Sequence, residues 1–120
     1  MSVPTDIALT QTDFFIQENP ELVRFSRTPI PLEGDGEGGV KRGAPGTVAE
    51  QTVRFVQPTD KTVRTSLEGE EVETVYMIVG YPDLDVERGD WFWRNGEKCE
   101  VSHIALRTDY IVYAEVFSRG

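Results

Sequence analysis

The chain has 120 residues, 38% of them hydrophobic, and its 21 Asp and Glu against 12 Lys and Arg give a net charge of −9. This length is enough for one domain with one hydrophobic core and leaves no room for a two-domain cleft enzyme. The negative charge argues against a protein that holds duplex DNA by neutralising its phosphates, because that affinity needs clustered Lys and Arg.

The N-terminal part of the chain predicts a short helix followed by a strand. Thr12 and Asp13, placed before an apolar run, are typical of a helix N-cap, and Pro20 disfavours a helical conformation at Asn19. We therefore expect a helix of about two turns between these residues. Residues 21–28 alternate in polarity and predict a strand with at least one polar face.

Residues 29–50 show no such periodicity. They hold six of the eleven glycines and three of the seven prolines. This segment is far longer than the usual connection of about 4–6 residues, and loops of such length are generally functional or disordered. Its Gly-rich stretch is superficially similar to a phosphate-binding loop, but no strand-to-helix context follows it and Glu37 would repel an anion. We therefore expect a long inserted loop that does not bind nucleotide.

The remaining sequence predicts short strands joined by turns. Residues 59–71 are polar and predict either a loop or a weak hairpin. Residues 72–80 are the most apolar run, so we expect a central strand that is buried on both faces at its C-terminal end. Asn95-Gly96 is the strongest signal for a tight hairpin, because a type I′ turn needs a positive φ at both positions. The predicted strands cover residues 51–57, 72–80, 90–94, 97–105 and 110–117.

Together these elements predict a mainly β fold. We expect one domain over residues 1–120, a small antiparallel β-barrel or sandwich of about five or six strands. It carries one short N-terminal helix and the long Gly/Pro-rich loop. The N-terminus lacks the basic region and apolar core of a signal peptide, and the single Cys99 cannot form an intrachain disulfide. We therefore expect a soluble protein made in a reducing cytoplasm, with no membrane partner.

Few residues are candidates for catalysis or metal binding. Cys99 and His103 share a strand face, but four strand residues separate their Cα atoms by roughly 13 Å, which is too far for a nucleophile and its base. The acidic residues at 68–73 and 83–87 lack the spacing of a calcium loop and predict solvated turns. One Cys and one His are too few for a four-ligand zinc site. We expect no catalytic residue, no metal and no cofactor.

Two tryptophans of the predicted hairpin are candidates for a binding surface. Successive strand residues point to opposite faces, so the rings of Trp91 and Trp93 can lie on the same face. Such a pair can stack on a base or a sugar, but packing in a core or a subunit interface is the commoner use of tryptophan. We favour the packing role. The expected hairpin and interface residues are Asp90, Trp91, Trp93, Asn95 and Gly96.

Several phrases of the chain occur in the same order in a known family. They are TDFFIQENP at 12–20, GDGEGG at 34–39, QTVRFVQP at 51–58, ERGDWFWRNGEKCEVSHI at 87–104 and YIVYAEVFSRG at 110–120. In these phrases the sequence resembles the small head-to-tail stopper, or head-closure, proteins of long-tailed bacteriophages, particularly phages of actinobacteria. Cys99 stands where Tyr is commoner in that family. Adaptor and tail-completion proteins share such degenerate motifs and remain alternatives.

The resemblance implies a structural role in the virion neck, reached from the host cytoplasm during assembly. Such proteins form a homo-oligomeric ring, here expected to be six- or twelvefold, between the portal with its head-tail adaptor and the tail terminator or completion protein. A loop from each subunit closes the channel on packaged double-stranded DNA without sequence specificity. The loop corresponds to residues 29–50. The residues assigned to it are Glu33, Gly34, Asp35, Gly36, Glu37, Gly38, Gly39, Lys41 and Arg42.

Physical arguments are consistent with this role. Glycines lower the cost of a re-entrant path, prolines stiffen the roots of a loop, and ring symmetry multiplies the modest contact that each loop makes. An acidic channel wall repels DNA and lets it slide. Lys41 and Arg42 are the exceptions, and we expect them to contact phosphate or acidic residues of a neighbouring subunit. A monomeric β-barrel that binds a ligand with Trp91 and Trp93 is the alternative from another class, and an enzyme is the least favoured.

Overall fold

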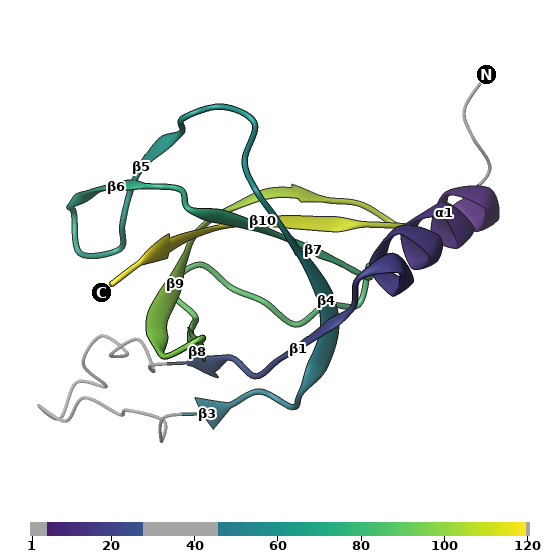
Figure 1. The fold of residues 1–120 in the computed structure, drawn as a ribbon, viewed down its shortest axis with the longest axis horizontal. Coiled ribbons are helices and arrows are strands. Elements are labelled where there is room, and N and C mark those ends of the chain that lie inside the picture. The colour runs from purple at the N-terminus through teal and green to yellow at the C-terminus, as the bar shows by residue number, and fades with distance from the viewer. Residues whose placement is uncertain (1–4, 28–45, 120) are drawn as a thin grey trace, which may run out of the picture.

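The computed structural model describes residues 5–27 and 46–119, which form a curled antiparallel sheet with one helix beside it (Figure 1). The helix α1 spans Thr5–Glu18. The described strands are β1 (Glu21–Val23), β2 (Ser26–Arg27), β3 (Gly46–Thr47), β4 (Gln51–Val56), β5 (Val63–Thr65), β6 (Glu71–Glu73), β7 (Tyr76–Gly80), β8 (Trp91–Arg94), β9 (Glu97–Arg107) and β10 (Val112–Ser118). The mainly β fold with an N-terminal helix is confirmed, although the described residues form ten strands where five or six were predicted.

Most of the strands belong to one sheet. Its order is β1-β4-β7-β10-β9-β8-β2-β3, and β5 pairs with β6 in a separate hairpin. The main sheet curls into a half-barrel (Figure 1). β1 lies at one edge and β2 lies next to the other edge, yet only Arg24 and Phe25 separate them in the chain. This crossing draws the two ends of the sheet together and breaks the single strand predicted at 21–28.

The interior of the half-barrel holds the larger core cluster. Strand alternation turns Val53 of β4, Ile78 of β7 and Val112 of β10 inward, and all three are fully buried. Phe25, in the crossing between β1 and β2, meets Phe92 of β8 edge to face, with ring centroids 5.5 Å apart. Burying side chains of this size contributes about 1.5–3 kcal/mol each, so the crossing is held in place by the core.

Helix α1 packs against the outside of the sheet through one stripe of residues. Ala8, Thr12 and Ile16 are buried, and their spacing of four places them on one helix face. Arg54 of β4 fixes the C-terminal end, because its guanidinium donates a 3.0 Å hydrogen bond to the Phe15 carbonyl and lies 4.0 Å above the Phe15 ring centroid. A cation is favourable at that end of a helix.

The predicted start of this helix at Thr12-Asp13 is wrong. The helix begins at Thr5, and Thr12 is an interior residue whose hydroxyl donates a 3.0 Å hydrogen bond to the Ala8 carbonyl. A threonine that bonds back to the preceding turn cannot cap the N–H groups that follow it. The predicted end before Pro20 is confirmed, since α1 stops at Glu18.

The strand predictions in the second half of the chain are largely confirmed. The strand predicted at 72–80 is divided into β6, which pairs with β5, and β7, which lies between β4 and β10. The last residues of β7, Ile78, Val79 and Gly80, are buried as predicted. The φ angles of Asn95 (53°) and Gly96 (78°) are both positive, as a type I′ turn requires. The polar stretch at 59–71 contributes to the β5–β6 hairpin. Gly46–Thr47, inside the loop predicted at 29–50, forms β3 instead.

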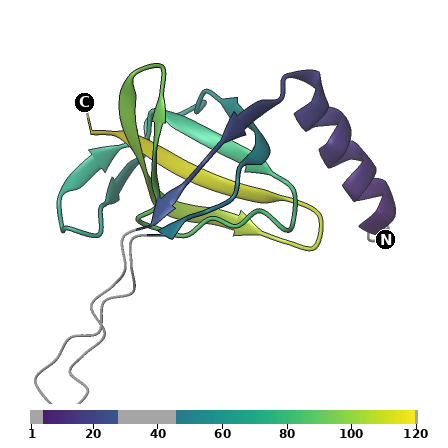
Figure 2. The ribbon, with the colours of Figure 1, turned by 90° about the horizontal axis from the view of Figure 1, so that it is seen from below.

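Three arginines hold the β5–β6 hairpin against the half-barrel. Arg64 donates to both carboxylate oxygens of Glu115 on β10, at 3.0 and 2.8 Å. Arg88 donates to the Thr65 carbonyl at 2.7 Å, and Arg119 bonds to Glu70. The hairpin therefore projects at the end of the molecule away from α1 as a fixed arm (Figure 2).

Candidate functional site

The root of the inserted segment is the first candidate site. β2 and β3 pair in antiparallel fashion, with Ser26 opposite Thr47 and Arg27 opposite Gly46. The amide of Val48 adds a 2.8 Å hydrogen bond to the Phe25 carbonyl. The chain therefore leaves the half-barrel after Arg27 and returns to it at Gly46 on two adjacent, paired strands.

Arg27 anchors this root to the body of the protein. Its Nε donates to Oδ1 of Asp90 and its Nη2 donates to Oδ2, each at 2.8 Å. Asp90 is 1% exposed and also accepts a 2.8 Å hydrogen bond from the Glu87 amide, so its carboxylate is fully engaged. The hydrogen bond from Arg27 to Asp90 raises the pKa of the guanidinium above its ordinary value, against the opposing effect of burial. The guanidinium of Arg27 therefore stays positively charged beside this carboxylate.

Two exposed acids extend this cluster. Asp85 lies 2.9 Å from Nη2 of Arg27, and Glu87 lies 3.4 Å from its Nε. The side-chain amide of Gln51 on β4 forms two hydrogen bonds with the backbone of Asp85. Its Oε1 accepts from the Asp85 amide at 2.7 Å, and its Nε2 donates to the Asp85 carbonyl at 3.0 Å. The loop between β7 and β8 is thereby held beside the root. A recess of about 460 Å³ opens there, lined by Arg27, Gly46, Thr47, Val48, Ala49, Gln51 and Asp85.

The β8–β9 hairpin is the second candidate site. Trp91 and Trp93 share the outer face of β8, while Phe92 between them is buried. The ammonium group of Lys98 lies 4.6 Å above the Trp91 ring centroid, whereas Trp93 is 65% exposed. A cation over an indole is an attractive contact that occupies the ring face. The tryptophans therefore offer one open ring, that of Trp93, with a positive charge beside it.

The structure separates the predicted hairpin residues into two groups. Trp91, Trp93, Asn95 and Gly96 belong to the hairpin, whose turn is tight and exposed. Asp90 precedes β8 and is buried against Arg27, so its side chain supports the root of the insert. The residues predicted for the channel loop, Glu33, Gly34, Asp35, Gly36, Glu37, Gly38, Gly39, Lys41 and Arg42, lie outside the described residues.

Cys99 and His103 both lie on β9. Cys99 is fully buried, and this burial raises the pKa of its thiol, which lowers the fraction of reactive thiolate. Within residues 5–27 and 46–119, no group of three His, Cys, Asp or Glu side chains is placed to bind a metal ion. No helix in the same part of the chain is long and apolar enough to cross a membrane.

Sequence reasoning missed the Arg27–Asp90 pair. The two residues are 63 positions apart, and no local pattern marks either as a partner of the other. The position of Arg27 could have indicated a role: it is a basic residue directly before the segment without periodicity, in a chain with many more acidic than basic residues. Comparison with known proteins adds no assignment, because no protein-family model and no curated protein sequence matches the chain.

Proposed function

We propose that this protein is a structural subunit of the neck of a long-tailed bacteriophage. In this proposal, six or twelve copies form a ring between the portal with its head-tail adaptor and the tail, and the ring closes the DNA channel after packaging. The ring also offers the surface on which the tail terminator or completion protein docks. The protein has no catalytic function in this scheme, and adaptor or tail-completion proteins are its nearest variants.

One observation carries the proposal beyond the resemblance in sequence. A long Gly/Pro-rich segment is mounted on a paired ribbon, Arg27 opposite Gly46, and the ribbon is locked to the half-barrel by a buried, charge-assisted bidentate contact. Such contacts are stronger and geometrically more exact than neutral hydrogen bonds. A ring that closes a channel needs this arrangement, because each copy must direct its segment along the same path. The proposal assigns that task to residues 29–50.

The test replaces the insert without disturbing its root. Because Arg27 and Gly46 are paired, residues 28–45 can be exchanged for Asn-Gly, which forms a two-residue hairpin turn. The exchanged protein should keep its unfolding midpoint in urea and still assemble on portal–adaptor complexes, as seen by electron microscopy. Heads that carry it should lose their DNA before tails attach, whereas heads with the natural chain retain it.

A matched substitution in the same segment tests the expected contact of its cations. Lys41→Ala with Arg42→Ala keeps the length and the glycines and removes both positive charges. We expect partial DNA loss from tail-less heads. The neck function is overturned if the natural chain adds no ring density to portal–adaptor complexes, or if the exchanged chain gives full, leak-tight heads.

The exposure of Trp93 favours a second candidate function, ligand binding by a monomeric protein. An open indole beside Lys98 can stack on a base or sugar of a ligand in a monomeric protein. This alternative predicts a stable monomer whose tryptophan fluorescence is quenched by an oligonucleotide or a glycan, and whose Trp93→Ala variant loses that response. Ring assembly on portal–adaptor complexes without quenching favours the neck function.

A further inference from the structure

The turn of the β8–β9 hairpin consists of two exposed residues, Asn95 and Gly96. Arg94 and Glu97 on either side of them form the last cross-strand pair of the hairpin. Among the residues that the structure describes, none forms a hydrogen bond with the Asn95 side chain or with the Gly96 amide. The turn therefore places a free side-chain amide directly before a free backbone N–H.

These two groups are reactive toward each other. The backbone nitrogen of Gly96, once deprotonated, is a nucleophile for the Cγ carbon of the Asn95 side chain. A Cβ at position 96 would crowd this nitrogen, and glycine has none. A Cβ built on Gly96 would also meet no atom within 4 Å, so no other part of the described fold covers this side of the turn. Water therefore has access to the reacting atoms.

We propose that Asn95 is a site of spontaneous deamidation. A bond forms between the Gly96 nitrogen and Cγ of Asn95, the Cγ–Nδ2 bond breaks, and ammonia leaves with the proton of the Gly96 amide. Water then opens the resulting succinimide ring at one of its two carbonyl carbons. Opening at Cγ gives aspartate, and opening at the main-chain carbonyl gives isoaspartate. Both products carry one more negative charge than the natural chain.

The folded hairpin limits the rate of this reaction. The φ angles of Asn95 (53°) and Gly96 (78°) fit a type I′ turn, in which ψ at the first central residue is about +30°. This ψ turns the Gly96 nitrogen away from the Asn95 side chain, whereas ring closure needs both on the same side of the Cα–C bond. The main chain must therefore rotate at Asn95, which requires local opening of the hairpin.

Arg94, next to the turn, shows what the modification affects. Its guanidinium donates to both carboxylate oxygens of Glu21 on β1, each at 2.9 Å, and lies 4.3 Å from the Phe55 ring centroid. Isoaspartate adds one atom to the main chain of the turn, and the length of a turn fixes the register of its hairpin. The isoaspartate form therefore weakens the contact of Arg94 with β1.

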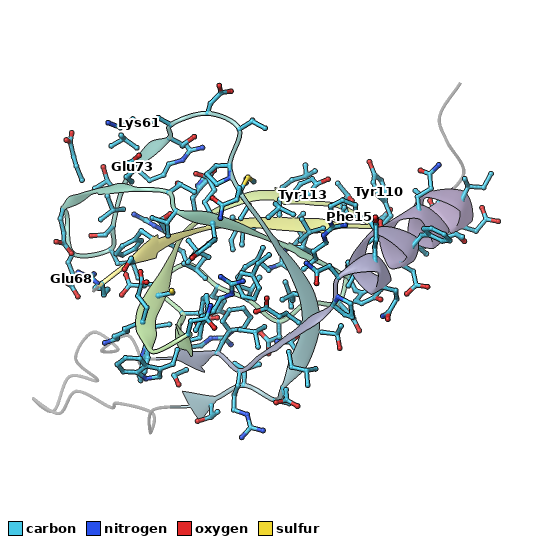
Figure 3. All side chains as sticks on the ribbon, in the orientation of Figure 1. Phe15, Lys61, Glu68, Glu73, Tyr110 and Tyr113 are labelled. Carbon is cyan, nitrogen blue, oxygen red and sulfur yellow. The ribbon has the colours of Figure 1, made fainter. Side chains whose placement is uncertain are left out.

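The chain provides its own control, because its two asparagines differ in the residue that follows. Asn19 is exposed as Asn95 is, but Pro20 has no backbone N–H that could attack the Asn19 side chain. Asn19 directly follows α1. Figure 3 shows Phe15 of this helix at the end of the molecule away from the β8–β9 hairpin of Figure 1.

The experiment incubates the natural chain at about pH 7 and about pH 9 and follows its peptides by mass spectrometry. The peptide with Asn95 should gain about 1 Da, faster at the higher pH because the nucleophile is the deprotonated nitrogen, and the peptide with Asn19 should not. Electron-transfer fragmentation distinguishes isoaspartate from aspartate. No gain at Asn95, while a synthetic peptide of residues 92–98 deamidates, overturns the proposal, and so does an equal gain at Asn19.

Two variants test the control of the rate by the hairpin. Glu21→Gln removes the charged partner of Arg94, so it should accelerate the reaction of the folded chain at least about twofold. Glu18→Gln removes the partner of Arg54 at the end of α1 and should leave the rate unchanged. Unfolding the natural chain in urea should accelerate the reaction at least about fivefold. Equal rates in the folded and the unfolded chain overturn this control.

The effect of the product on the fold is measured by urea unfolding of the isoaspartate form, separated by chromatography. This form should have a lower midpoint than the natural chain. Asn95→Asp adds the same charge without the extra main-chain atom and should keep the midpoint, because Asp-Gly also forms a type I′ turn. Equal midpoints for the natural and isoaspartate forms overturn the predicted effect on Arg94. None of these measurements depends on portal–adaptor complexes, so their results are independent of the proposed function.

Discussion

Arg27 and Asp90 form a bidentate ion pair in which the carboxylate is almost completely buried. Arg27 is the last residue that the structure describes before the insert. The two hydrogen bonds are 2.8 Å long, and the third bond to Asp90 comes from the Glu87 amide. A buried carboxylate of this kind is costly unless every acceptor position is used. The pair therefore links the stability of the fold to the geometry of the insert's root.

The first prediction concerns this pair. Asp90→Ala should lower the free energy of unfolding by about 3 kcal/mol, because it leaves Arg27 without its buried partner. Glu87→Ala, which removes an exposed partner of the same guanidinium, should cost less than about 1 kcal/mol. Urea unfolding of both variants measures the difference. Equal losses would show that the buried carboxylate has no special part in holding the root.

A second prediction concerns the crossing between β1 and β2. Phe25→Ala and Phe92→Ala should each cost about 3–5 kcal/mol, because both rings are buried in the core. Their edge-to-face contact should appear in a double-mutant cycle as a coupling energy of about 1 kcal/mol. Phe25 and Ile16, which belong to separate core clusters, should couple by less than about 0.5 kcal/mol. A larger value for this control pair contradicts the separation of the two clusters.

The local patterns of the sequence account for much of this architecture. Asn95-Gly96 predicted the tight hairpin, because few other residue pairs tolerate two positive φ angles. The apolar run ending at Gly80 predicted the central strand, because a strand covered on both faces contains few polar residues. These predictions succeeded because each depends on neighbours in the chain.

Features that depend on contacts between residues far apart in the chain could not be predicted from the sequence. The register of β9 against β10 shifts twice, opposite Tyr113/Ala114 and opposite Glu115/Val116, and no local pattern marks either place. Glu115 on β10 is buried, and Arg64 of β5, 51 positions away in the chain, donates to its carboxylate. A groove between α1 and the β9–β10 hairpin was also missed, since it needs Phe15 and Tyr110 to come together in space.

The third prediction follows from Glu115. The hydrogen bond from Arg64, assisted by one from Thr74, holds the pKa of Glu115 below its ordinary value of 4.5, although burial acts in the opposite direction. A carboxyl with a depressed pKa in the folded state stabilises the fold above its unfolded pKa, and this stability is lost as the pH falls through the folded value. The fold should therefore weaken below about pH 4.5.

Glu115→Gln tests this dependence. The variant should be less stable than the natural chain at pH 7 and should lose less stability between pH 7 and about pH 3, because one linked proton is removed. Urea midpoints at several pH values measure both effects. Glu71→Gln, at an exposed position of β6, is the matched control. A Glu115→Gln curve parallel to that of the natural chain would falsify the assignment.

The last prediction separates two reasons for glycine. A Cβ on Gly80 would lie 2.4 Å from Cδ2 of the buried Leu84, so Gly80→Ala should cost about 2–3 kcal/mol through overpacking. A Cβ on Gly96 meets no atom within 4 Å, but its φ of +78° disfavours any side chain, so Gly96→Ala should cost about 1 kcal/mol. Adding Leu84→Ala to each variant distinguishes the causes in urea unfolding. With Gly80→Ala, the combined loss in the free energy of unfolding should be smaller than the sum of the single losses, because truncating Leu84 makes room for the new methyl group. With Gly96→Ala, the two losses should add. Additive losses at Gly80 would mean that contact with Leu84 is not what requires glycine there.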